Sequence, residues 1–173
     1  MSQLLGERTC VSIAPPHGLE QICASFGDIF KYIRSDHTLD VSWQTEFLTR
    51  IALPFTIPLS WDKSRAVSQI ICHNLVADPF TTAFDEIDHR DIEHKITSFG
   101  GCFNFRPQRT GTKLSTHAWG IAIDLNPESN VQGSAGNMDP AIVEIFKQAG
   151  FTWGGDWEGQ SRDPMHFQYC TGY

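Results

Sequence analysis

Apolar side chains recur at helical spacing in several parts of the chain. Asp78–Pro79 and Asp139–Pro140 each place a capping carboxylate before a proline, which is typical of the first turn of a helix. Gly150 is placed to end the second of these helices. The pattern predicts helices over residues 19–33, 67–75, 79–87 and 140–149, and a short helix or an irregular packed segment over residues 43–51.

Other stretches have the patterns of extended chain. The segment Leu53–Leu59 contains two prolines, which exclude a helix interior, so we expect it to wrap over the domain in extended form. Strand-like alternation predicts strands over residues 96–106, 121–125, 151–157 and 165–169, the last two joined by a loop. Gly100–Gly101 predicts a bulge or a close approach inside the first of these strands.

The order of these elements indicates an α+β fold, with helices mostly in the N-terminal half and strands mostly in the second half. A chain of 173 residues with 40% hydrophobic content can bury one core of its own. We expect residues 66–173 to form that core and residues 1–65 to pack on it as a helical and extended segment of the same compact unit.

Composition narrows the functional classes. The net charge of −7 argues against a nucleic-acid binder and against a basic patch for anionic membranes. No apolar run approaches the roughly 20 residues that span a bilayer, and the N-terminus lacks the pattern of a secretory signal, so we expect synthesis in a cytoplasm. The five cysteines include no CxxC pair, which favours reduced, buried thiols over a disulfide framework.

One stretch and one later motif carry the candidate chemistry. His117 and Asp124 lie seven residues apart across the Trp119–Gly120 turn, and His166 follows 42 residues after Asp124. Strand parity allows Asp124 and His166 to face one polar cleft. Two imidazoles and one carboxylate suit a catalytic zinc with one open position, although spacing alone fits a hydrogen-bonded polar cluster equally well.

Two further charged groups would complete a hydrolytic site. Asp163 stands beside His166 but is separated from it by Pro164, so it could act as a base without ligating the metal. A zinc would lower the pKa of bound water from about 15.7 toward 7 and polarise a scissile carbonyl. Arg106, or else Arg109, is the candidate partner for the developing oxyanion. Solvated arginines or structural ion pairs are the alternative for both.

The motifs resemble those of a known family. Ser115-x-His117-x-x-Gly120-x-Ala122-x-Asp124, followed by Asp163-x-Met165-His166-Phe167, is similar to the motif pair of the VanY-type zinc D-alanyl-D-alanine carboxypeptidases and L-alanyl-D-glutamate endopeptidases, a family that includes phage endolysins. The flanking sequence segments at residues 100–106, 117–126 and 150–157 extend the resemblance over roughly residues 70–170.

The resemblance implies one zinc ion per chain, held by His117, Asp124 and His166, with Asp163 as the catalytic base and an upstream arginine that stabilises the substrate carbonyl or oxyanion. It also implies the hedgehog/DD-peptidase fold, in which a small central antiparallel sheet carries the zinc. Three further residues are candidate contacts to substrate: Ser115, Trp153 and Trp157.

We therefore expect a monomeric zinc metallopeptidase that hydrolyses peptidoglycan stem peptides and has no nucleic-acid or membrane partner. The expected absence of a signal favours a phage-type enzyme that reaches the cell wall after lysis or with a holin. A cytoplasmic D-Ala-D-Ala dipeptidase is one alternative. A non-catalytic zinc module that recognises cell-wall peptide or a protein partner is the other.

Overall fold

A long hairpin and a small four-stranded sheet form the β structure of the described residues. The computed structural model describes residues 13–109 and 112–173. The hairpin pairs β1 (Leu48–Pro58) with β2 (Ala66–His73). The second sheet is antiparallel and has the order β3-β4-β6-β5, built from β3 (Phe99–Gly101), β4 (Ala122–Leu125), β6 (His166–Gln168) and β5 (Thr152–Trp153).

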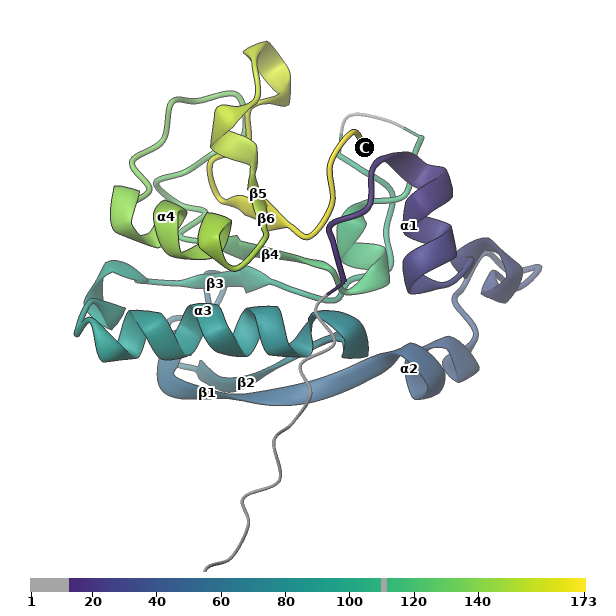
Figure 1. Ribbon diagram of the computed structural model, residues 1–173, viewed down its shortest axis with the longest axis horizontal. Helices are drawn as coiled ribbons and strands as arrows, with labels where there is room; N and C mark the ends of the chain where they lie inside the picture. The colour runs from purple at the N-terminus through teal and green to yellow at the C-terminus, as the bar shows by residue number, and fades with distance from the viewer. Residues whose placement is uncertain (1–12, 110–111) are drawn as a thin grey trace, which may run out of the picture.

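The described residues also form four α-helices. They are α1 (Gly18–Phe26), α2 (Val41–Phe47), α3 (Ala77–His89) and α4 (Pro140–Gln148). In Figure 1, α3 crosses the molecule between the β1–β2 hairpin on one side and α4 on the other. The expected α+β class with a small antiparallel sheet is confirmed.

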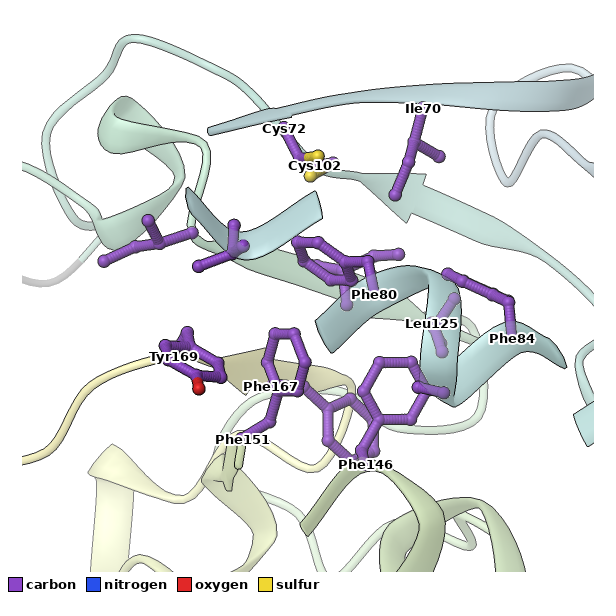
Figure 2. Packing of buried hydrophobic residues seen from close by; sticks show 14 of the residues in the cluster. Ile70, Cys72, Phe80, Phe84, Cys102, Leu125, Phe146, Phe151, Phe167 and Tyr169 are labelled. Carbon is purple, nitrogen blue, oxygen red and sulfur yellow. The ribbon is translucent and has the colours of Figure 1, made fainter. Parts of the chain in front are cut away.

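The core forms where α3 meets α4 and the four-stranded sheet. Figure 2 shows Phe80 and Phe84 of α3 pointing toward the rings of Phe146, Phe151 and Phe167. The ring centroids of Phe80 and Phe151 lie 4.6 Å apart, and those of Phe146 and Phe167 lie 4.5 Å apart in a stacked arrangement. Because Phe167 belongs to β6, this aromatic layer fixes one face of the strand and turns its other face away from the core.

The Asp-Pro pairs predicted the existence of α3 and α4, but only the second cap is confirmed, because the expected cap at Asp78 is wrong. The Asp139 side chain accepts a hydrogen bond from the Ala141 backbone at 2.9 Å, as expected of a cap. The predicted stripe of Phe80, Ala83, Phe84 and Ile87 is fully buried. α3 begins at Ala77 with Val76 as its N-cap, so Asp78 lies inside the first turn of the helix.

The helix predicted over residues 67–75 is wrong, because this segment forms β2 and a short 3₁₀ helix, Asn74–Val76. The apolar residues Val67, Ile70 and Ile71 fit either period over so short a run. Pairing with β1 decides between them, because Ile51 lies opposite Ile70 and Ile57 lies opposite Val67. The segment Leu53–Leu59 is extended, as expected, and forms the later part of β1. The two longest strands therefore lie in the N-terminal half, although β3, β4, β5 and β6 lie in the second half, as expected.

Two predicted elements are shorter than expected. The helix over residues 19–33 breaks at Gly27, whose φ is +87° and whose missing Cβ leaves room for the rings of Phe47 and Trp43. The strand over residues 96–106 is limited to β3, with the expected irregularity at Gly100–Gly101. Beyond it the chain leaves the sheet, and the Asn104 backbone donates to the His117 carbonyl at 3.0 Å.

The expected boundary between residues 65 and 66 falls in the turn that joins β1 to β2. Each side of that boundary contributes one strand to the same hairpin. Among the described residues, no helix combines the length and the apolar character needed to cross a bilayer.

Candidate metal centre

Strand register brings two of the candidate ligands together. In the antiparallel pair β4–β6, Asp124 lies directly opposite His166, and Ile123 lies opposite Phe167. Because side chains alternate along a strand, Asp124 and His166 share one face while Ile123 and Phe167 enter the core on the other. Gly100 of β3 gives the carboxylate room, since a Cβ there would lie 2.9 Å from the Cβ of Asp124.

A short 3₁₀ helix, Thr116–Trp119, adds the third ligand. Ser115 is its N-cap, and Gly120 ends it with a φ of +69°. A side chain at Gly120 would be strained at that φ and would also approach the His73 backbone nitrogen at 2.9 Å. The tight turn returns the chain directly into β4, so His117 lies over the strand that carries Asp124.

The three side chains form a compact buried cluster. The Oδ1 atom of Asp124 lies 3.1 Å from Nε2 of His117 and 2.9 Å from Nδ1 of His166. Each residue offers one potential ligand atom, and these three atoms all lie within 4.8 Å of one another. Two imidazole nitrogens and one carboxylate oxygen are the donor set of a catalytic zinc site, so the cluster fits that metal.

The outward nitrogen of each imidazole has its own hydrogen-bond partner. Nδ1 of His117 lies 2.6 Å from the backbone carbonyl oxygen of Cys102. Nε2 of His166 lies 3.0 Å from Oε1 of Gln168 and 3.3 Å from the hydroxyl of Thr116. Carbonyl oxygens only accept, so each outward nitrogen can donate a proton to its partner. When a cation replaces the inward hydrogen bonds to Asp124, each ring can then keep its proton on the outward side and present an inward lone pair to the ion.

The charges of the cluster are mutually dependent. Burial alone would raise the pKa of Asp124, but the adjacent His117 and His166 outweigh it and hold that pKa far below its usual value. Burial would likewise lower the pKa of His166, but the hydrogen bond and negative charge of Asp124 raise it. Asp124 is therefore ionised, and a cation at the cluster would satisfy a carboxylate that is only 5% exposed.

Asp163 lies on the same cleft and is not part of the cluster. Burial raises the pKa of its carboxyl group to about 6, an effect that the neighbouring His166 opposes and the charge of Asp124 adds to. Its Oδ1 atom is buried and has no hydrogen-bond partner among the described residues. Its backbone nitrogen donates to the Gly154 carbonyl at 2.9 Å, which holds the loop against the start of β6.

The cluster opens into a cleft of about 480 Å³. Arg106 and Arg109 line it on the loop before the 3₁₀ helix, together with Lys113. Nη1 of Arg106 donates to the neighbouring Pro107 carbonyl at 3.1 Å, whereas Arg109 is exposed and its charge acts on Asp163. A protein of net charge −7 thus places three cations on one wall of this cleft.

The structure separates the two candidate tryptophans. Trp157 lines the cleft, with its ring centroid 5.7 Å from that of His166. Trp153 lies away from the cleft, donates to the Pro164 carbonyl at 2.8 Å and stacks at 6.5 Å on Phe167. Ser115 is buried at the edge of the cleft, where its hydroxyl accepts a long 3.4 Å hydrogen bond from the His117 backbone.

The remaining histidines lie apart from the cluster. His17, His37, His89 and His94 are exposed, while His73 is buried among aromatic rings. His117, Asp124 and His166 form the only group with metal-ligand spacing in the described part of the chain. Cys23, Cys72, Cys102 and Cys170 are free thiols, and Cys10 lies outside the described residues.

Gln168, Thr116 and the Cys102 carbonyl were missed as partners of the ligands. The sequence does contain a signal for Gln168, since it lies two residues after His166 and so shares its strand face. It contains none for the Cys102 carbonyl, because a backbone group can serve at any residue and its position depends on how the chain leaves β3.

A comparison with protein families found one match. Residues 108–169 match a family model described as D-alanyl-D-alanine carboxypeptidase. The matched stretch contains the three residues of the cluster, Asp163 and Arg109, and it begins after Arg106. A search of curated proteins found no match to the chain. The family match supports assignment to the zinc DD-peptidases and, with the buried His–Asp–His group, indicates a metallopeptidase.

Proposed function

We propose that the protein is a zinc-dependent peptidase that cleaves peptidoglycan stem peptides. The match of residues 108–169 to the D-alanyl-D-alanine carboxypeptidase model supports this proposal. The observation that carries the proposal is the convergence of Nε2 of His117 and Nδ1 of His166 on Oδ1 of the buried Asp124. Both rings also have an acceptor for a proton on their outward sides, so both inward nitrogens could present lone pairs to a bound cation.

Nε2 of His117, Nδ1 of His166 and the carboxylate of Asp124 would hold the ion. A zinc bound there supplies Lewis acidity, which lowers the pKa of water and polarises the scissile carbonyl. The chain's own residues supply the remaining requirements of hydrolysis: a base for the attacking water, a proton for the leaving amine, and a positive charge near the carbonyl oxygen.

Asp163 would be the general base. Its carboxyl pKa of about 6 is high enough to accept a proton and low enough for the group to be mostly ionised at neutral pH. The carboxylate lines the cleft, where it would receive the proton from the attacking water and deliver it to the departing amine, and its buried Oδ1 has no hydrogen bond that would compete. The support for this role is the place of Asp163 on the cleft wall beside the ligands.

Arg109 would stabilise the developing negative charge on the carbonyl oxygen. Its guanidinium is exposed in the cleft and close enough to influence Asp163, whereas Arg106 already donates to the backbone of its own loop. Trp157 and Ser115 would form walls against which the peptide lies. Trp153 is not part of this proposal, because it packs on the core side of β6.

The substrate would be the D-Ala-D-Ala end of a stem peptide, in keeping with the description of the matched family. Cleavage between L-Ala and D-Glu is the other bond considered. Mass spectrometry of products from purified peptidoglycan separates the two, since the first releases free D-Ala and the second releases a shortened peptide. Addition of a chelator should abolish either product.

The test of the mechanism is Asp163→Asn, which keeps the shape of the side chain and removes the base. Hydrolysis should fall by about 10²–10⁴-fold. Zinc content should stay at one ion per chain, because Asp163 is not a ligand. Asp156→Asn is the matched control, since it removes a carboxylate that is half-exposed and paired with Lys147.

A wild-type rate in Asp163→Asn would refute the base assignment. Zinc binding without chelator-sensitive hydrolysis of any wall preparation would refute the peptidase and favour a non-catalytic zinc module.

A further inference from the structure

The two histidines of the cluster present different ring nitrogens to its centre. His117 presents Nε2, and its outward Nδ1 lies 2.6 Å from a backbone carbonyl, that of Cys102. His166 presents Nδ1, and its outward Nε2 lies against side chains only. The tautomer of His117 is therefore set by the fold, whereas that of His166 depends on particular side chains.

Gln168 is the nearer of the two partners of His166. Its Oε1 lies 3.0 Å from Nε2, compared with 3.3 Å for the Thr116 hydroxyl. That hydroxyl also points at Oε1, to which it donates at 3.1 Å. The Thr116 hydroxyl therefore spends its proton on Gln168 and can offer Nε2 only a lone pair, at the longer distance. Gln168 is the nearer acceptor for a proton on Nε2, and it also holds the Thr116 hydroxyl in place.

The fold leaves Gln168 little freedom. It lies two residues after His166 on β6, on the same strand face, and opposite the small Ala122 of β4. The side chain is only 3% exposed, and its Nε2 donates to the Cys170 carbonyl at 3.4 Å. That bond turns the amide nitrogen away from the ring and the amide oxygen toward it.

We infer that Gln168 is a positioning residue for the metal centre, which fixes His166 as the Nε2–H tautomer and so directs the lone pair of Nδ1 at the ion. The inference rests on the proposed zinc site. Imidazole in water favours neither nitrogen strongly, so without an acceptor at Nε2 part of the population would carry its proton on Nδ1. Those molecules would have two ligands in place of three.

The test is the zinc affinity of Gln168→Leu, measured by competition with a chromophoric chelator. Leucine keeps similar bulk against Ala122 and removes the acceptor. The dissociation constant should rise by about 10–100-fold, the usual effect of losing such a partner. Gln168→Glu restores an acceptor at the same length and should bind zinc at least as tightly as the wild type. Gln148→Leu on the exposed face of α4 is the matched control.

A second readout observes the tautomer directly. Long-range ¹H–¹⁵N correlation spectra of the zinc-loaded wild type should show the His166 proton on Nε2 and the His117 proton on Nδ1. Either wild-type affinity in Gln168→Leu or a proton on Nδ1 of His166 would overturn the inference. An equal loss of affinity in Gln168→Leu and Gln168→Glu would also overturn it, because the effect would then come from packing.

The two proposals can fail separately. If the wild type binds no zinc, the proposed function fails, and the spectra of the same protein still decide the tautomer of His166. If the wild type binds zinc and cleaves wall peptide while Gln168→Leu is unchanged, only the role of Gln168 is lost. Thermal unfolding of each variant identifies a loss of affinity caused by loss of the fold.

Discussion

His73 should make the stability of this protein fall in mildly acidic solution. Its ring is 1% exposed and packs edge-on against Phe26 at 4.9 Å. Nδ1 accepts a hydrogen bond from the Leu75 backbone nitrogen at 3.2 Å, and Nε2 lies 3.1 Å from the Phe26 carbonyl oxygen. The neutral ring with its proton on Nε2 satisfies both partners. A second proton on Nδ1 would face the N–H of Leu75.

Burial accordingly lowers the pKa of His73 from 6.5 to about 4, although the bond to Phe26 opposes this. Below pH 6.5 His73 binds a proton in the unfolded chain but stays neutral in the folded chain, so stability falls as the pH falls from 6.5 toward 4. With those two pKa values, the loss between pH 8 and pH 5 is about 2 kcal/mol, and the limit below pH 4 is about 3 kcal/mol.

The measurement is urea unfolding followed by tryptophan fluorescence at pH 8 and pH 5, at equal total zinc. His73→Gln removes the titrating ring and keeps a polar side chain. Its difference in unfolding free energy between the two pH values should be smaller than that of the wild type by about 2 kcal/mol. His89→Gln, at the exposed end of α3, serves as the control for loss of an imidazole.

The reasoning would be refuted if His73→Gln and the wild type lost the same free energy between pH 8 and pH 5. The absolute stability of the variant does not decide the matter, because loss of the ring also removes packing. Groups that titrate in both proteins, including Asp163 and the metal ligands, cancel in the comparison.

Two further substitutions probe the loops around the site. In Gly154→Ala the new Cβ would collide with the Asp163 carbonyl, so the free energy of unfolding in urea should fall by about 1–3 kcal/mol. The rate of hydrolysis should fall by a larger factor, because Asp163 must move, and an unchanged rate would contradict this. In Asn126→Ala the backbone nitrogens of Thr97 and Ser98 lose their acceptor, and the new residue must keep a φ of +51°, so the free energy of unfolding should fall by about 2–4 kcal/mol. Asn126→Asp keeps the acceptor and should lose less, and equal losses in the two variants would contradict the argument.

Local signals predicted the elements that carry their own start and stop. The Asp-Pro pairs indicated both α3 and α4, because first-turn chemistry depends on neighbouring residues, but only Asp139 is a cap. The β2 segment was misassigned because its apolar residues fit a helix as well as a strand, and only the partner strand β1 decides the outcome. The break at Gly27 depends on rings from α2 that approach it from about 20 residues away.

The candidate site followed from spacing and parity where strands were identified correctly. Parity of β4 and β6 placed Asp124 and His166 on one side, and the register shows them as direct neighbours. The place of Trp153 could not be predicted, since its two-residue strand has no period to read and its ring turns toward Phe167. The hydrogen-bond partners of the imidazoles depend on distances between segments, which a sequence pattern does not contain.

Because Asp124 lies opposite His166, a complete metal centre requires the correct register between β4 and β6. A slip of β6 by one residue would place Phe167 at the ion and His166 in the aromatic core. Chains with that error would have the composition and nearly the secondary structure of the native protein, yet would lack His166, one of the three ligands, at the metal centre. Single-residue insertions or deletions within these two short strands should therefore be far less tolerated than in the loops on either side. In a refolded sample, the fraction of chains that bind zinc would measure the fraction in which β4 and β6 pair in the native register.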